Sequence, residues 1–324
     1  MRAKVDPEVG GGQRLEYGDG SDGQMIPGPN GPAVRLVPSL TATRWHDDRM
    51  RPLPRLPTEW VEINTTTMDG IRLRGVRVPG PPDLVDPVCF VICHGMTNSL
   101  GQPGTTAALK AFARHGEVVA FDFRGHGRSG GRSTVGADEV ADVEAAIAAA
   151  RAGGHQRVVL VGFSMGGAII LRHQGGHQGA GRRGDAYRHA ADAVVSVSAP
   201  ARWFLRETRF MRRVQWLLEH PAGIFVGPRV GIRLGAPWRD VPSTPLEEVA
   251  HIAPTPLLIV HGDNDHYFDD DQGRLLHRAA PGSELWIIEG MGHAESGISA
   301  ATIDRIAAWA AEVLAVAGEA TAER

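Results

Sequence analysis

An apolar run meets a glycine-flanked serine in the stretch VVLVGFSMGG, residues 158–167. The stretch matches G-x-S-x-G and lies between a β-rich run and a segment of helical pattern, which is the context that this motif requires. A nucleophilic serine projects from a tight turn between strand and helix, where nearby side chains would collide with backbone. Gly162 and Gly166 remove those collisions, and the helix start places its positive end beside Ser164. The stretch predicts a nucleophile at Ser164, with an inert serine in a glycine-rich turn as the alternative.

Further apolar runs on both sides of this stretch predict the rest of a sheet. We expect strands buried on both faces at 88–93, 117–123, 157–163, 193–199, 256–261 and 284–288. Residues 60–63 and 71–78 alternate around Asp69-Gly70, as an antiparallel hairpin does. One helix between the runs follows Asp138-Glu139 and has an apolar face of Val140, Val143, Ile147 and Ala150. The alternation of apolar runs with helical segments predicts an α/β fold with a mostly parallel sheet covered by helices on both faces.

Composition and charge fit a folded enzyme-sized protein. The chain has 324 residues, of which 42% are hydrophobic and 22% are charged. Basic residues number 34 and acidic residues 37, so the formal net charge is −3 and no global field attracts nucleic acid. We therefore expect no nucleic-acid partner.

Two further features bear on the compartment. Cys89 and Cys93 lie in one expected strand, where their separation of about 13 Å exceeds the roughly 7 Å that a disulfide spans. Residues 1–13 contain acidic side chains and no apolar core of a secretory signal. The longest charge-free apolar stretch, 158–171, is shorter than a membrane span of about 18 residues. These observations favour a cytoplasmic protein.

The chain divides into three parts by composition. Residues 1–57 hold eight Gly and eight Pro without a sustained period, which indicates a flexible or irregular arm. The globular domain is expected at 58–317, followed by a short tail at 318–324. Within the domain, residues 200–253 have a helical pattern and no strand signal, which predicts an insertion over the sheet.

The partners that a serine nucleophile needs follow two later strands. A serine hydroxyl requires a base, and the base requires a group that orients it. Run 256–261 is followed by Gly262-Asp263-Asn264-Asp265, and run 284–288 by Gly290-Met291-Gly292-His293. Because the carboxyl ends of parallel strands lie at one edge of the sheet, Ser164, Asp265 and His293 can converge there. Their chain order is serine, aspartate, histidine.

In combination, these motifs resemble the α/β-hydrolase superfamily across residues 58–317. The loop after that family's third strand corresponds to His94-Gly95-Met96-Thr97, and its fourth-strand turn corresponds to residues 122–129. The resemblance implies that Ser164 is the nucleophile of the elbow, His293 the general base and acid, and Asp265 the orienting carboxylate. It further implies an oxyanion hole made by the backbone N–H groups of Met96 and Met165.

Other side chains compete for these roles. Asp263 also follows run 256–261, but Asp265 matches the family's H-G-x-x-D position. His94, His261 and His266 lie near the same sheet edge, and loop packing is the more typical role for the first two. His293 is preferred because Gly290 and Gly292 permit an exposed loop conformation after the final strand.

Cofactor and metal motifs are weak. The segment Gly125 to Gly130 fits G-x-G-x-x-G, yet the following helix does not open at its glycines, so a dinucleotide site is not favoured. His173, His177 and His189 lie in an expected extended loop, 173–190, without a cysteine or acidic cluster to complete a metal site. We expect neither a cofactor nor a metal.

The insertion contains an expected basic amphipathic helix at 202–218. Its apolar face is Trp203, Phe204, Phe210, Met211, Val214, Leu217 and Leu218, opposite Arg202, Arg206, Arg209 and Arg213. In the family that the chain resembles, such an insertion forms a small helical cap over the pocket, and its apolar face lines an acyl-binding cleft. Simple packing against the core is one alternative. Contact with an anionic membrane surface is another, less favoured one.

These inferences predict a serine hydrolase of the carboxylesterase or lipase-like class. It would cleave an ester, thioester or amide of a small-molecule acyl substrate through an acyl-enzyme. A serine at the elbow disfavours epoxide hydrolases and haloalkane dehalogenases of that family, which have an aspartate there. Acyl transfer, perhydrolysis and carbon–carbon bond hydrolysis use similar triads and stay open, as do a non-catalytic binding protein and the oligomeric state.

Overall fold

The computed structural model describes residues 53–84, 87–178 and 188–322. The first 52 residues of the expected arm, and part of the expected loop at 173–190, lie outside this set. Among the described helices, none combines the length and apolarity that crossing a bilayer requires.

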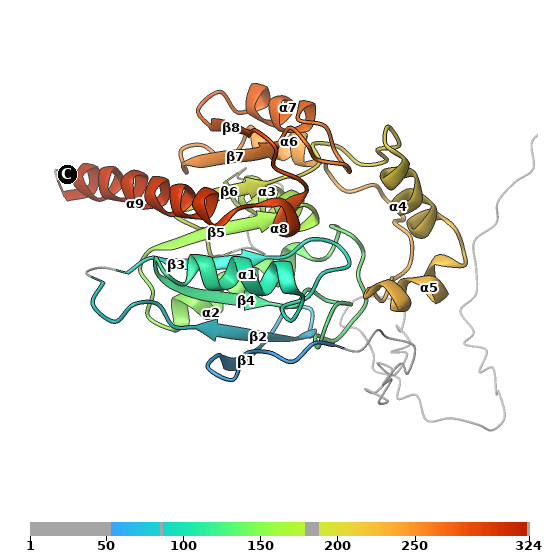
Figure 1. The fold of residues 1–324 in the computed structure, drawn as a ribbon, viewed down its shortest axis with the longest axis horizontal. Helices are drawn as coiled ribbons and strands as arrows, with labels where there is room; N and C mark the ends of the chain where they lie inside the picture. The colour runs from blue at the N-terminus through green and yellow to red at the C-terminus, as the bar shows by residue number, and fades with distance from the viewer. Residues whose placement is uncertain (1–52, 85–86, 179–187, 323–324) are drawn as a thin grey trace, which may run out of the picture. The chain divides into compact units, whose positions relative to one another are not determined.

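Eight strands form one sheet in the order β1-β2-β4-β3-β5-β6-β7-β8 (Figure 1). Pairs β1/β2 and β2/β4 are antiparallel, whereas the other neighbours are parallel. The mostly parallel sheet and the opening hairpin are therefore confirmed. The strands are β1 (Val61–Thr66), β2 (Arg72–Val78), β3 (Cys89–Cys93), β4 (Glu117–Phe121), β5 (Val158–Phe163), β6 (Ala193–Val197), β7 (Leu257–Gly262) and β8 (Glu284–Ile288).

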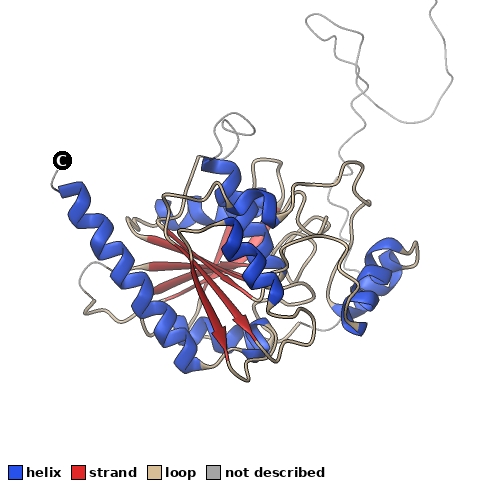
Figure 2. Cartoon of the chain, turned by 90° about the horizontal axis from the view of Figure 1, so that it is seen from above, coloured by secondary structure: helices blue, strands red, loops and turns tan. Residues whose placement is uncertain are grey.

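Helices cover both faces of the sheet (Figure 2). They are α1 (Pro103–Phe112), α2 (Val140–Ala152), α3 (Met165–Gln178), α4 (Arg209–Glu219), α5 (Gly223–Val226), α6 (Pro245–Val249), α7 (Asp271–Ala279), α8 (Ala294–Gly297) and α9 (Ala300–Ala322), with a 3₁₀ turn η1 (Gly227–Val230). Successive strand residues point to opposite faces. Phe90 and Ile92 of β3 join the core under α1 and α9, whereas Val91 joins the core under α2 and α3.

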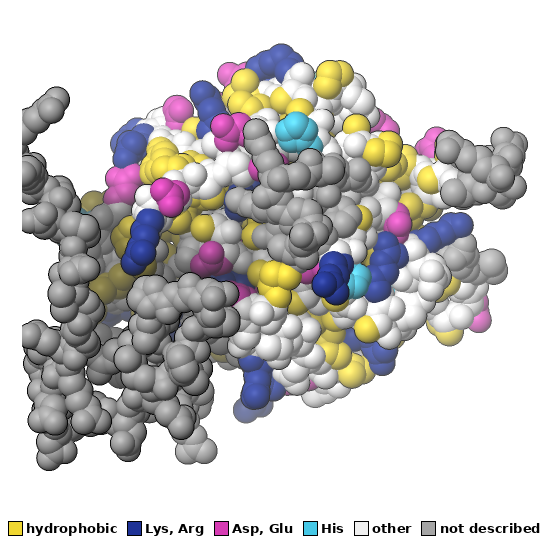
Figure 3. Space-filling view, turned by 180° about the vertical axis from the view of Figure 1, so that it is seen from behind, with side chains coloured by type: hydrophobic (Ala, Val, Ile, Leu, Met, Phe, Trp, Pro, Cys, Tyr) yellow, Lys and Arg dark blue, Asp and Glu magenta, His cyan; other side chains and the backbone are white. Residues whose placement is uncertain are grey.

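The two cysteines lie four residues apart on β3, and both are buried free thiols, as expected. On the face seen from behind, acidic and basic side chains are interspersed rather than gathered by sign (Figure 3). This distribution is consistent with the nearly balanced formal charge.

The helix expected at 202–218 begins later than predicted. It is α4, which starts at Arg209 because the Thr208 side chain accepts the N–H of Met211 and caps it. Phe204 has φ of +60° and is exposed rather than part of a helical apolar face. The apolar spacing upstream of Thr208 reflects loop packing, in which the Trp203 ring contacts Trp238 and its Nε1–H donates to Pro242.

The prediction of an extended loop at 173–190 is wrong for its first part. Helix α3 continues to Gln178, and His173 is buried within it. The Glu144 carboxylate of α2 bonds to the rings of His173 at 2.9 Å and His189 at 2.7 Å. It also accepts the backbone N–H groups of Arg188 and His189. The Glu144 carboxylate therefore joins α2 to His173 of α3 and to the chain at Arg188 and His189.

Glu144 supplies a pH-dependent prediction. Burial alone would raise the pKa of Glu144, but hydrogen bonds from His173, His189 and backbone outweigh it and lower the pKa to about 2 from 4.5. The folded state therefore gains stability from this group above pH 4.5 and loses it as the pH falls toward 2. Glu144→Gln is expected to lower the free energy of unfolding at pH 7 by about 1–2 kcal/mol.

Urea unfolding of both proteins from pH 7 to pH 3 measures this difference. The gap between wild type and Glu144→Gln should shrink with acidification below pH 4.5, because the wild-type advantage is lost there. A gap that stays constant over the range would contradict the assignment.

Candidate active site

Ser164 stands at a sharp turn between β5 and α3. Its backbone has φ of +51°, and its N–H donates to Val197 of β6 at 2.8 Å. A Cβ on Gly162 would lie 2.6 Å from the Gly166 carbonyl carbon, and one on Gly166 would overlap the Cys93 carbonyl. Only glycine allows these backbones to approach so closely. The local sequence thus forces the Ser164 side chain out of the sheet edge.

The loops after β7 and β8 bring two further side chains to Ser164. His293 Nε2 lies 2.9 Å from Ser164 Oγ, and His293 Nδ1 lies 2.7 Å from Asp265 Oδ2. The Asp265 side chain is fully buried, whereas 16% of the His293 side chain is exposed. Three residues separated by up to 129 positions therefore form one hydrogen-bonded chain from carboxylate to hydroxyl.

Asp265 is held in its ionised form. Burial alone would raise its pKa, but the hydrogen bond and charge of His293 and the N–H groups of Tyr267 and Phe268 hold the pKa below 3.8. Those N–H groups donate to Asp265 Oδ1 at 2.8 and 3.2 Å, which leaves Oδ2 for His293. An ionised acceptor at Nδ1 favours a proton on that nitrogen and leaves Nε2 free to accept one.

Aromatic rings restrict the His293 imidazole. Its centroid lies 4.5 Å from that of Tyr267 and 5.5 Å from that of Phe268. His261 also lies near Asp265, with its Nε2 3.8 Å from Asp265 Oδ2. Burial lowers the pKa of His261, which keeps its imidazole neutral. The imidazole is therefore packed in the orientation in which it reaches Ser164.

The rival side chains contact other groups. Asp263 accepts the N–H of Gly290 at 2.7 Å and so joins the loops after β7 and β8. His94 contacts the Gly95 carbonyl through Nδ1 at 2.8 Å and accepts the Phe123 N–H at Nε2, as loop packing requires. His266 stacks on Phe210 of α4. The structure thus distinguishes Asp265 from Asp263 by contact with His293.

Two backbone N–H groups, those of Met96 and Met165, are expected to form an oxyanion hole. Met96 lies three residues after Cys93, the last residue of β3. Met165 is the first residue of α3 and lies three residues after Gly162 of β5. Cys93 and Gly162 are paired in these adjacent parallel strands. Within the described residues, neither N–H donates to a protein acceptor. Both are available for an oxyanion beside Ser164.

The glycine-rich segment 125–130 forms a turn before α2 and does not open that helix. The Asp122 carboxylate accepts the N–H groups of Leu100 and Arg128. A Cβ on Gly127, whose φ is +42°, would overlap that carboxylate. Among the described residues, no group of three His, Cys, Asp or Glu side chains is arranged to hold a metal ion.

The insertion packs against the rest of the domain through two apolar clusters. Leu205 and Met211 pack with Phe268, next to His293. A second cluster joins the insertion to the loop that carries Met96 and includes Leu217, Ile232, Leu234, Met96 and Val135. Side chains of the insertion therefore pack both on the ring of Phe268, which contacts His293, and on the Met96 loop.

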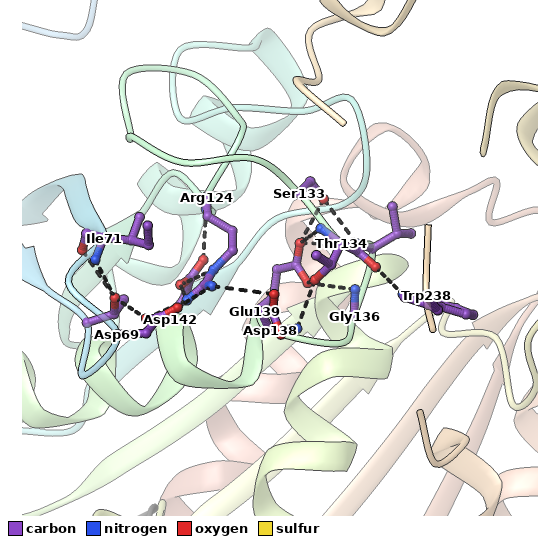
Figure 4. A network of polar contacts seen from close by, with 12 residues as sticks. Asp69, Ile71, Arg124, Ser133, Thr134, Gly136, Asp138, Glu139, Asp142 and Trp238 are labelled. Atoms are coloured by element: carbon purple, nitrogen blue, oxygen red, sulfur yellow. Dashed lines mark hydrogen bonds and ion pairs between the residues drawn. The ribbon is translucent and has the colours of Figure 1, made fainter. Parts of the chain in front are cut away.

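A polar network fixes the loop beneath the insertion (Figure 4). The Glu139 carboxylate accepts the backbone N–H groups of Thr134, Val135 and Gly136. Trp238 of the insertion donates its Nε1–H to the Thr134 carbonyl at 2.5 Å. Farther along, Arg124 bridges Asp69 and Asp142. The end of the insertion is thereby attached to the main domain.

A model of the alpha/beta hydrolase family matches residues 90–309, which contain every residue of the hydrogen-bonded chain described above. The chain belongs to this family. The expected resemblance and the expected fold, with a mostly parallel sheet and helices on both faces, are confirmed. Membership supports hydrolase chemistry in general terms.

Individual proteins are similar to this chain in sequence or in fold. The chain is 28% identical over 254 residues to the uncharacterized protein YfhR of Escherichia coli strain K12, covering 76% of this chain and 78% of YfhR. The esterase Pf2001 of Pyrococcus furiosus has a TM-score of 0.58 at 21% identity, covering 79% of this chain and 96% of that one. The esterase RhEst1 of Rhodococcus sp. ECU1013 has a TM-score of 0.55 at 19% identity, covering 78% and 99%. These two structures are similar in fold.

One buried residue near the site was missed by sequence reasoning. Glu295 accepts the Gly95 N–H at Oε1, at 2.7 Å. Its position two residues after His293 is the only local signal, and glutamate there forms no catalytic motif with its neighbours. The contact becomes visible only when residues 200 positions apart are brought together.

Proposed function

We propose that this α/β hydrolase is a serine hydrolase that cleaves a carboxylic ester, with thioesters and amides as related substrates, through an acyl-enzyme. The observation that carries the proposal is the hydrogen-bonded chain from Asp265 through His293 to Ser164. The apolar side chains of the insertion that pack beside Phe268 and Met96 favour an acyl group of low polarity. The names of the structural neighbours Pf2001 and RhEst1, both esterases, agree with an ester substrate.

The geometry supports a two-step reaction. Ser164 Oγ attacks the substrate carbonyl while His293 Nε2 accepts the hydroxyl proton, and Asp265 stabilises the imidazolium that forms. The N–H groups of Met96 and Met165 bind the oxyanion, and loss of one such donor costs about 10²- to 10³-fold in rate. His293 then protonates the leaving alcohol, which departs. A water molecule then gives a proton to His293 and bonds to the acyl carbon; the bond from that carbon to Ser164 Oγ breaks, His293 returns the proton to Oγ and the carboxylic acid leaves.

Intact-mass measurement after treatment with a fluorophosphonate tests the proposal. The activated Ser164 hydroxyl should displace fluoride, so that the wild type gains the mass of one phosphonyl group. His293→Ala is expected to react at least about 10³-fold more slowly, because the serine loses its base. Ser164→Ala should gain no mass.

The same proteins are then assayed with p-nitrophenyl esters of increasing acyl length. Turnover by the wild type alone supports ester hydrolysis, and the rate profile measures the acyl cleft. Folded wild-type protein that neither gains the adduct nor hydrolyses any ester of the panel would reject the proposal and favour a binding protein.

A further inference from the structure

Glu295 is a buried acid outside the three side chains of the proposed mechanism. It is the second residue of α8, and 5% of its surface is exposed. Its Oε1 accepts the N–H of Gly95, at 2.7 Å. The side chain therefore ties the loop that carries His293 to the loop that carries Met96.

The surroundings of Glu295 are unusual for a structural acid. Burial of a carboxyl group is costly unless charges or several hydrogen bonds compensate it. Within the described residues, no Lys, Arg or His forms an ion pair with Glu295, and the Gly95 N–H is the donor that bonds to its carboxyl group. An apolar side chain would fill the same space at lower cost. The acid is therefore better explained by what it does to the loop at Gly95.

Glu295 and Ser164 both border the same side of Gly95. A Cβ added to Gly95 would be 3.3 Å from Glu295 Oε2 and 3.3 Å from Ser164 Cβ. The Gly95 backbone is thus packed close to both the carboxyl group and the serine, and a larger residue would crowd them. A small movement of this backbone changes the distance between the oxyanion loop and Ser164.

The two peptide groups that flank Gly95 are both anchored. Glu295 holds the N–H of the first, and the carbonyl of the second accepts the Asn98 N–H at 3.2 Å and contacts His94 Nδ1 at 2.8 Å. Because a trans peptide is planar, the Met96 N–H points away from the Gly95 carbonyl. Anchoring both peptides therefore sets the direction of the Met96 N–H.

The backbone bends sharply at Ala294, between His293 and Glu295. Ala294 has φ of +48°, a conformation that alanine rarely adopts, and its N–H donates to Ser198 Oγ at 3.2 Å. This bend lets His293 contact Ser164 while Glu295 contacts Gly95. The base and the oxyanion loop are thus positioned by one short segment.

We propose that Glu295 is a positioning residue, which holds the Gly95 N–H and thereby aligns the Met96 N–H with the oxyanion formed at Ser164. The inference rests on the proposed serine hydrolase function. It extends that function by making the histidine loop responsible for the oxyanion hole as well as for the base.

Two substitutions of Glu295 test the role. Glu295→Ala removes the acceptor, and kcat for a p-nitrophenyl ester is expected to fall about 10- to 100-fold while KM changes less than about 3-fold. Glu295→Gln retains an oxygen that accepts the Gly95 N–H, and should keep at least about a third of kcat. Active sites are titrated with the fluorophosphonate so that kcat refers to folded enzyme.

An aryl trifluoromethyl ketone supplies a readout that a purely structural role would not move. Ser164 Oγ adds to the carbonyl carbon of the ketone, and the carbonyl oxygen becomes the oxyanion of a hemiketal. The inhibition constant of the ketone should therefore rise about 10-fold or more in Glu295→Ala, in parallel with the fall in kcat. Glu248→Ala is the matched control, because Glu248 is an equally buried acid on α6, 6% exposed. That control should lose thermal stability and keep both kcat and the inhibition constant.

The outcomes separate this inference from the proposed function. Unchanged kcat in Glu295→Ala, equal losses in the alanine and glutamine variants, or a fall in kcat without weaker ketone binding would each overturn the positioning role. A wild type that shows neither ester turnover nor labelling at Ser164 would overturn the function on which the inference rests.

Discussion

Ser164→Ala is expected to lower kcat for ester hydrolysis by about 10³- to 10⁶-fold while the protein stays folded. The substitution removes the only atom that attacks the carbonyl in the proposed mechanism and leaves the backbone contact with Val197 in place. Steady-state kinetics with a p-nitrophenyl ester, together with the circular dichroism melting curve, measure both effects.

Ser196→Ala is the control for this experiment. Ser196 is a buried serine on β6, and its hydroxyl has no hydrogen-bond partner among the described residues. Its loss should leave kcat near the wild-type value. If Ser164→Ala retained more than about a tenth of wild-type kcat, Ser164 would not be the nucleophile.

Asp265→Asn is expected to lower kcat by about 10⁴-fold. The fully buried carboxylate accepts a hydrogen bond from His293 Nδ1, whereas an asparagine amide can present a donor there and favour the tautomer that cannot accept the Ser164 proton. The effect should fall mainly on kcat and on the rate of fluorophosphonate labelling, because the substitution acts through His293 and the activation of Ser164.

Asp263→Asn is a matched control in the same loop. Asp263 accepts the Gly290 N–H through one oxygen, and asparagine retains an oxygen that can do the same. We expect kcat to change less than about 5-fold. A larger loss in Asp263→Asn than in Asp265→Asn would exchange the roles of the two aspartates.

The parts of the fold that sequence predicts well depend on local patterns. The strands of the parallel part are continuous apolar runs, so the runs at 88–93 and 284–288 locate β3 and β8 within a residue. The prediction that 284–288 is buried on both faces is wrong, because β8 is an edge strand and is only partly buried. Ser164 and His293 are predictable for a similar reason, since glycines flank both and mark backbone that must turn sharply. The spatial convergence of the triad then follows from the common edge of parallel strands.

Features that depend on tertiary contacts were not predictable. The apolar residues before Thr208 have helical spacing, yet Trp203 packs on Trp238 and the helix begins only where Thr208 caps it. His173 reads as a loop residue among glycines, but Glu144 on another helix gives it a buried partner. The contact of Glu295 with Gly95 likewise has no counterpart in any short stretch of sequence.

Much of the backbone strain in the described residues lies at one edge of the sheet. Of the six described non-glycine residues with positive φ, four, namely Thr97, Ser164, Ser198 and Ala294, follow β3, β5, β6 and β8. Each conformation costs on the order of 1 kcal/mol and persists because surrounding packing enforces it. The turns that hold Ser164 and Ala294 are therefore fixed by the backbone of the main domain, whereas Leu205 and Met211, which pack with Phe268, belong to the insertion. The sequence of the insertion can therefore change without altering those turns.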